Sequence, residues 1–110
     1  MTASITTVPP GRAIDQQRFE RLAKVWKSRS RYMSNPAQIA MLPEYQRIIG
    51  MGETAVPFIL KEMRREPDQW FWALAAITEE DPIPEEAKGD VERMTQAWVD
   101  WGIQKGLIAA

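Results

Sequence analysis

The chain has no cysteine and no histidine among its 110 residues. Disulfide bonds and thiol nucleophiles require cysteine, most structural zinc sites use it, and imidazole bases and imidazole metal ligands require histidine. These chemistries are therefore excluded, and most familiar active sites are excluded with them. We expect a protein that is not an enzyme, with no catalytic residues, no metal site and no cofactor.

The chain also lacks a long hydrophobic run. No apolar stretch approaches the ~20 residues that span a bilayer. The first residues, Met1 to Gly11, have neither the basic start nor the apolar centre of a secretion signal. We therefore expect a cytoplasmic protein that does not contact membranes.

What the sequence does contain is typical of one globular domain. Hydrophobic residues make up 45% of the chain and charged residues 26%, which is ordinary for a folded protein. Five tryptophans are present, and each would bury roughly 200 Å² if fully enclosed. Tryptophan packing is therefore expected to dominate the stability of the core.

The N-terminal residues 1–13 are predicted to form a flexible arm, because they are rich in threonine and include Pro9-Pro10-Gly11. Residues 14–110 are predicted to form a single helical domain. Asp15 is the expected N-cap of the first helix, with Ile14 and Phe19 as a hydrophobic staple.

Helical spacing of apolar residues recurs along the rest of the chain. Asn35 and Asp90 are in the right places to cap two of these helices, and residues 79–89 read as an acidic loop. The segment 69–78 is apolar on nearly every side, which predicts the central helix of the domain. We expect an all-α fold, a compact bundle of about five helices, because no stretch alternates as a strand would.

Residues Met51 to Ile77 resemble a HEAT-like repeat. The matching features are a glycine before the first helix, Ala-Val-Pro in its first turn, a Pro-Asp turn that would cap the second helix through Asp68, and an alanine-rich second helix. The resemblance implies one antiparallel helical pair. The whole chain is also similar to a family of small, functionally uncharacterised bacterial proteins, which implies a compact helical fold and no particular activity.

Three clusters could suggest chemistry, and each has a simpler explanation. The acidic residues of 79–90 lack the spacing of a calcium loop and are better read as a solvated loop. Glu62 and Glu66 lie four residues apart but are interleaved with Lys61 and Arg65, as on an exposed charged face. The serines near residue 30 have no histidine or evident lysine partner.

Charge is unevenly distributed, since residues 1–42 carry +5 and residues 43–110 carry −6. This asymmetry predicts either an acidic partner, nucleic acid included, or a fold whose halves complement each other. The basic patch candidates mix cations with an aromatic residue, as phosphate-binding surfaces do. They are Arg18, Arg21, Lys24, Lys27, Arg29, Arg31 and Tyr32. The alternative is a solvated helix face.

Tryptophan is enriched at binding hot spots, and five tryptophans are many for a domain of this size. Trp70 and Trp72 lie about 200° apart on a helix, so they cannot face one neighbour. Trp72 and Trp101 are the partner-binding candidates. We expect a non-catalytic protein-interaction module, such as an accessory or inhibitory subunit of a larger bacterial protein, with no small-molecule substrate. The alternative is a nucleic-acid-binding accessory protein that uses the basic N-terminal half.

Overall fold

The computed structural model describes residues 10–110, in which the backbone forms six α-helices, two short 3-10 helices and no strand. The predicted all-α bundle is therefore confirmed for this part of the chain. The helices are α1 (Pro10–Ser30), α2 (Pro36–Ala40), α3 (Pro43–Gly50), α4 (Ala55–Arg65), α5 (Phe71–Thr78) and α6 (Val91–Gln104), and the 3-10 helices are η1 (Gly52–Thr54) and η2 (Glu85–Ala87). None of the described helices is long and apolar enough to cross a membrane.

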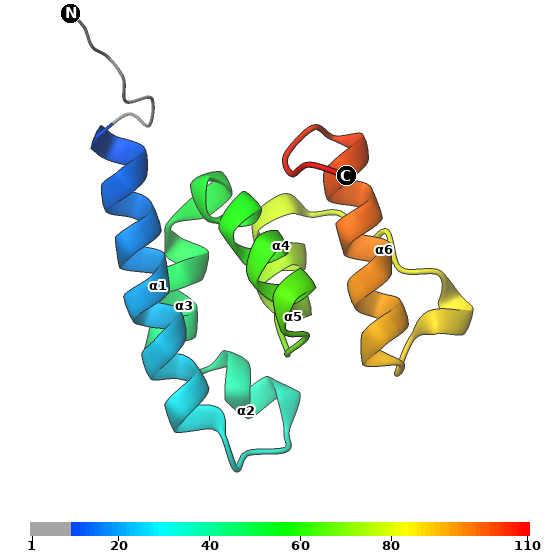
Figure 1. The fold of residues 1–110 in the computed structure, drawn as a ribbon. Helices are drawn as coiled ribbons and strands as arrows, with labels where there is room; N and C mark the ends of the chain where they lie inside the picture. Colours follow the sequence, from blue (N-terminus) through cyan, green and yellow to red (C-terminus); the bar gives the residue numbers. More distant parts are fainter. Residues whose placement is uncertain (1–9) are drawn as a thin grey trace, which may run out of the picture.

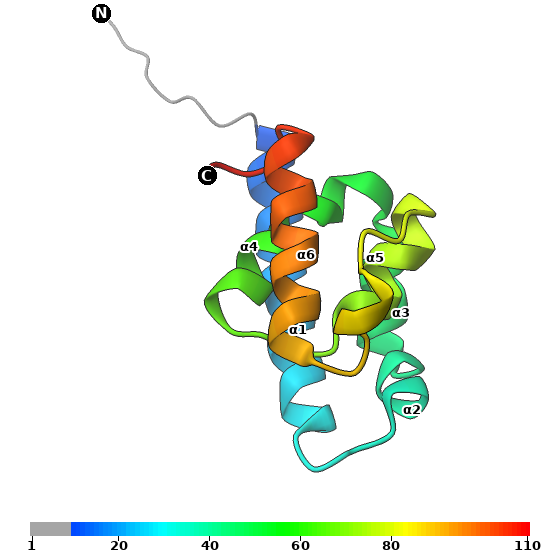
Figure 2. The same cartoon turned by 90° about the vertical axis from the view of Figure 1, so that its right-hand side faces the viewer.

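Helix α4 lies between α1 and α6, as Figure 1 shows. Helix α1 packs against α3 and α4, and α3 in turn packs against α5. The view in Figure 2 places α5 beside α3 and leaves α6 on the outside of the bundle. The main helical neighbour of α6 is α4.

An aromatic cluster fills the core between α1, α3 and α5. The ring of Trp26 lies 4.4 Å from that of Trp70 and 5.2 Å from that of Tyr45, measured between centroids. All three side chains are fully buried, and rings at these separations gain energy beyond the area they bury. The indole of Trp26 also donates a hydrogen bond to the carbonyl oxygen of Ile39 (3.1 Å). The expectation that tryptophans form the core is confirmed for Trp26, Trp70 and Trp98.

The first helix begins earlier than predicted. Residues 10–13 of the predicted arm belong to α1, so Asp15 lies inside the helix and does not cap it. Ile14 is 63% exposed and is not the residue before the cap, so the predicted staple does not form. Pro10 is the first described residue of α1, and proline is well suited to a first helical turn because its φ angle is already helical. Residues 1–9 of the predicted arm lie outside the described residues.

The central helix is α4 and not α5, so that prediction was wrong. Helix α4 buries five residues, Ala55, Val56, Ile59, Leu60 and Met63. Helix α5 itself buries only Ala73 and Leu74. An amphipathic helix such as α4 can contact α1, α5 and α6 along one wide stripe. The apolar composition of α5 instead leaves apolar side chains at the surface.

The start of α5 is fixed by a tyrosine from another helix. Asp68 was predicted to cap this helix, but the N-cap residue is Trp70. The side chain of Trp70 makes no capping hydrogen bond. The hydroxyl of Tyr45, on α3, donates to the carbonyl oxygen of Gln69 (2.9 Å) and accepts from the N–H of Ala73 (2.8 Å). It therefore satisfies one of the free N–H groups of the first turn, which a cap residue ordinarily does.

Two other predicted caps are confirmed. The side chain of Asn35 accepts a hydrogen bond from the N–H of Ala37 (2.9 Å) at the start of α2. The side chain of Asp90 accepts one from the N–H of Arg93 (3.2 Å) at the start of α6. The Asp90 cap defines the end of the loop between α5 and α6, and this loop positions the candidate site.

Candidate functional site

Trp72 is the most exposed of the five tryptophans. Its side chain is 48% exposed, whereas Trp26, Trp70 and Trp98 are at most 1% exposed. Trp70 and Trp72 thus face different surroundings, as their spacing predicts. The neighbouring Ala75 and Ala76 of α5 are exposed as well. Helix α5 therefore presents an apolar surface to solvent.

Trp72 lines a groove between α5, the loop 79–90 and the first half of α6. We call it the Trp72 groove; its volume is about 580 Å³, which lies within the range of ligand sites. The lining residues are Pro36, Gln69, Phe71, Trp72, Ala75, Asp81, Ile83, Gly89, Val91, Met94 and Trp98. Asp81 is the only charged residue among them.

The groove exists because α6 packs on α4 and not closely on α5. Trp98, on α6, is buried and lines the groove. Its indole N–H has no hydrogen-bond acceptor among the described residues. Such an unpaired buried donor is uncommon in folded proteins and lowers their stability.

An acidic segment, residues 79–92, borders the groove, and Asp81, Ile83, Gly89 and Val91 of this segment line it. The segment carries seven carboxylates: Glu79, Glu80, Asp81, Glu85, Glu86, Asp90 and Glu92. The same segment has one cation, Lys88, whose Nζ lies 3.6 Å from Asp81 and 3.5 Å from Glu85. Within residues 10–110, no three acidic groups are close enough to hold a metal ion. We call this segment the acidic rim.

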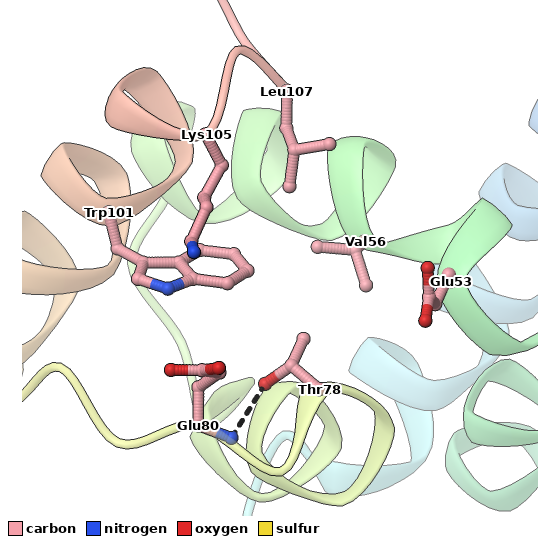
Figure 3. Close-up of a pocket in the computed structure, with 7 residues that line it drawn as sticks. All are labelled: Glu53, Val56, Thr78, Glu80, Trp101, Lys105 and Leu107. Atoms are coloured by element: carbon pink, nitrogen blue, oxygen red, sulfur yellow. Dashed lines mark hydrogen bonds between the residues drawn. The ribbon is translucent and has the colours of Figure 1, made fainter.

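Trp101 lines a second, smaller pocket of about 330 Å³ at the other end of α6. Figure 3 shows the indole beside Lys105 and Leu107, with Thr78 and Glu80 across the pocket and Glu53 at its far side. The hydroxyl of Thr78 donates to the carbonyl oxygen of Leu74 (2.7 Å) and accepts from the N–H of Glu80 (3.1 Å). These contacts form neither a nucleophile–base pair nor a pair of carboxylates.

Trp101 is less accessible than Trp72, the other partner-binding candidate. Its side chain is partly buried, and its indole N–H is enclosed without an acceptor among the described residues. Its ring packs edge-on against that of Trp98, with centroids 5.1 Å apart. Trp101 therefore supports the packing of α6, and Trp72 is the more accessible partner-binding candidate.

The basic patch is divided by ion pairs within the molecule. Lys27 contacts both Glu62 and Glu66 of the segment that includes α4, with its Nζ 2.5 Å from the Glu66 carboxylate. Burial lowers the pKa of Lys27, but the hydrogen bonds with the two glutamates outweigh this and raise it above the ordinary lysine value. The same hydrogen bond lowers the pKa of Glu66. Lys27 is thus engaged in holding α1 against α4.

Arg29 also forms an ion pair within the molecule. Its guanidinium donates to both carboxylate oxygens of Glu44, at 3.1 and 3.0 Å. Arg18, Arg21 and Lys24 are exposed along α1, and the guanidinium of Arg31 lies 5.8 Å from the ring of Tyr32. Tyr32 is 93% exposed. The predicted patch is therefore reduced to these five residues.

Comparison of the chain with family models, with curated proteins and with solved structures gives no match. The HEAT-like repeat stays a prediction.

Several groove residues were not predicted from the sequence. Phe71, Ile83 and Met94 come from three separate segments, and none is unusual by itself. The available signal was the composition of α5, which is apolar on every side. Such a helix is expected to be covered on every side, either by its own domain or by a partner.

Proposed function

We propose that the protein is a non-catalytic protein-interaction module, such as an accessory or inhibitory subunit of a larger protein, and that it binds its partner through the Trp72 groove. The observation that carries this proposal is the half-exposed Trp72 on an apolar wall of α5. An exposed indole beside other apolar side chains is the composition of a binding hot spot. Scattered single apolar residues would not support the proposal, but a continuous lining does.

The position of Trp72 fits this role. It lies on a helix whose start is held by Tyr45 and whose inner side is buried at Ala73 and Leu74. A partner would therefore meet a side chain on a rigid element, which reduces the entropy lost on binding. The chemistry of the Trp101 pocket offers no catalytic pair, so binding is favoured over catalysis.

The first experiment compares Trp72→Ala with Tyr32→Ala in copurification from the native host at moderate salt. Both side chains are exposed aromatics, but only Trp72 lines the groove. We expect Trp72→Ala to weaken partner binding by about 30-fold or more, as truncation of a hot spot does, while Tyr32→Ala leaves it unchanged. Equal melting temperatures would establish that both variants fold. Full retention of the partner by a folded Trp72→Ala variant would disprove the proposal.

Nucleic-acid binding through the basic N-terminal half is the second candidate. Its support is the exposed Tyr32 ring next to the guanidinium of Arg31, because aromatic rings and arginine together stack on bases. In the same purification, this function predicts DNA or RNA that dissociates as salt rises. It also predicts that Tyr32→Ala, and not Trp72→Ala, loses the partner.

A further inference from the structure

We propose that the Trp72 groove receives a basic amphipathic helix of the partner, which is apolar on one side and rich in lysine or arginine on the other. This inference rests on the proposed function and adds the kind of segment that is bound. It is carried by the shape of the groove together with the charge of its rim.

The shape of the site favours a helix over an extended strand. Residues 10–110 contain no strand, so this part of the molecule offers no sheet edge to which a partner strand could be added. Side-chain contacts must supply the affinity instead. The groove runs between α5 and the start of α6, and a third helix can lay an apolar stripe, spaced three and four residues apart, between two helices.

The apolar side of such a helix would face Trp72, Phe71 and Met94. These residues differ in stiffness: the two aromatic rings supply rigid area, whereas methionine adapts its shape to the residue it meets. Apolar contact alone does not determine the partner's charge. The lining contains no cation and a single carboxylate, that of Asp81.

The acidic rim determines which charge the partner's segment should carry. The segment 79–92, which borders the groove, carries seven carboxylates and one lysine. Asp81 lines the groove, whereas Glu80 lines the Trp101 pocket. The two contacts of Lys88, at 3.5 and 3.6 Å, are those of an exposed side chain. Exposed pairs of this kind contribute little and compete poorly with other cations. A segment with lysine or arginine flanking its apolar stripe would therefore be attracted, and an acidic segment would be repelled.

The test uses synthetic helical peptides of about 18 residues, long enough to form a helix readily when bound. One peptide has leucine in a helical stripe and lysine elsewhere; matched versions replace lysine with glutamine or with glutamate, and a fourth scrambles the stripe. Binding to the full chain is followed by the NMR signal of the Trp72 indole N–H, identified by its absence in Trp72→Phe. We expect the lysine peptide to shift this signal and to bind more tightly than the other three.

Two variants separate the contributions of the wall and the rim. Trp72→Ala lacks the reporting indole, so its affinity is measured by calorimetry beside that of the unaltered chain; it should bind the lysine peptide about 30-fold more weakly or worse. The double change Glu86→Gln with Glu92→Gln removes two exposed carboxylates and should weaken the lysine peptide by roughly two- to ten-fold. The same double change should leave the glutamine peptide unaffected.

Each alternative result overturns the inference in a recognisable way. Equal binding of the lysine and glutamate peptides would eliminate the charge selection, while the proposed interaction function would stand. Equal binding of the scrambled peptide would eliminate the helical stripe. If no peptide shifts the Trp72 signal, the inference fails, and the copurification experiment decides the proposed function independently.

Discussion

Gly102 illustrates how a single residue sets the approach of two helices. It is buried on α6, at the contact with α4. A Cβ atom added there would lie 2.6 Å from Cδ1 of Leu60 and 3.4 Å from Cγ1 of Ile108. Both neighbours are themselves buried, so neither can move into free space. The main role of this glycine is therefore the close packing of α6 on α4.

The change Gly102→Ala is therefore expected to destabilise the protein. Forcing a methyl group into a filled core typically costs about 1–3 kcal/mol, and the better helix propensity of alanine returns about 1 kcal/mol. We expect a net loss of up to about 2 kcal/mol, measured by urea unfolding.

Gly50→Ala is the matched control for this experiment. Gly50 ends α3, and nothing lies within 4 Å of an added Cβ atom. Alanine should be neutral or slightly stabilising there, because only the helix propensity changes. If Gly102→Ala proved as stable as Gly50→Ala, the packing role of Gly102 would be wrong.

At the scale of elements, the start of α5 depends on α3 through one hydroxyl group. Tyr45 is fully buried, and burial raises the pKa of its hydroxyl. The group therefore remains protonated over the ordinary pH range and can both donate to Gln69 and accept from Ala73.

Tyr45→Phe should lower the stability of the fold by about 1–3 kcal/mol. The ring would still fill the aromatic core, but the buried N–H of Ala73 would lose its acceptor, which costs energy of this order. Tyr32→Phe serves as the control, because the Tyr32 side chain is 93% exposed. Thermal unfolding of the two variants compares them directly, and identical melting temperatures would show that the Tyr45 hydroxyl does not cap α5.

The elements that the sequence predicted correctly are those defined by local patterns. Asn35 and Asp90 cap helices through hydrogen bonds to residues two or three positions away, so their role is visible in a short stretch of sequence. Asp68 has the same local pattern, but the start of α5 is held by the hydroxyl of Tyr45, which lies 28 residues from Ala73 in the chain. Tertiary contacts of this kind override a local preference and leave no local signal.

At the scale of the whole molecule, the candidate site was only partly predictable. Trp72 could be singled out because its spacing from Trp70 requires the two to face differently. The groove could not, because its lining combines residues from α5, the loop and α6. The basic patch was overestimated for a related reason: Lys27 finds its carboxylate partners 35 and 39 residues away.

Helix α6 is attached to the rest of the fold mainly through α4, while α1, which carries Trp26 of the aromatic cluster, lies on the other side of α4 (Figure 1). An element with one main neighbour can open without disturbing the rest of the protein. Native-state hydrogen exchange should therefore show α6 amides opening at a lower free energy than those of α4, and equal protection would instead indicate one cooperative unit. A segment bound in the Trp72 groove would touch both α5 and α6, so binding would slow exchange in α6 and make the two parts open together.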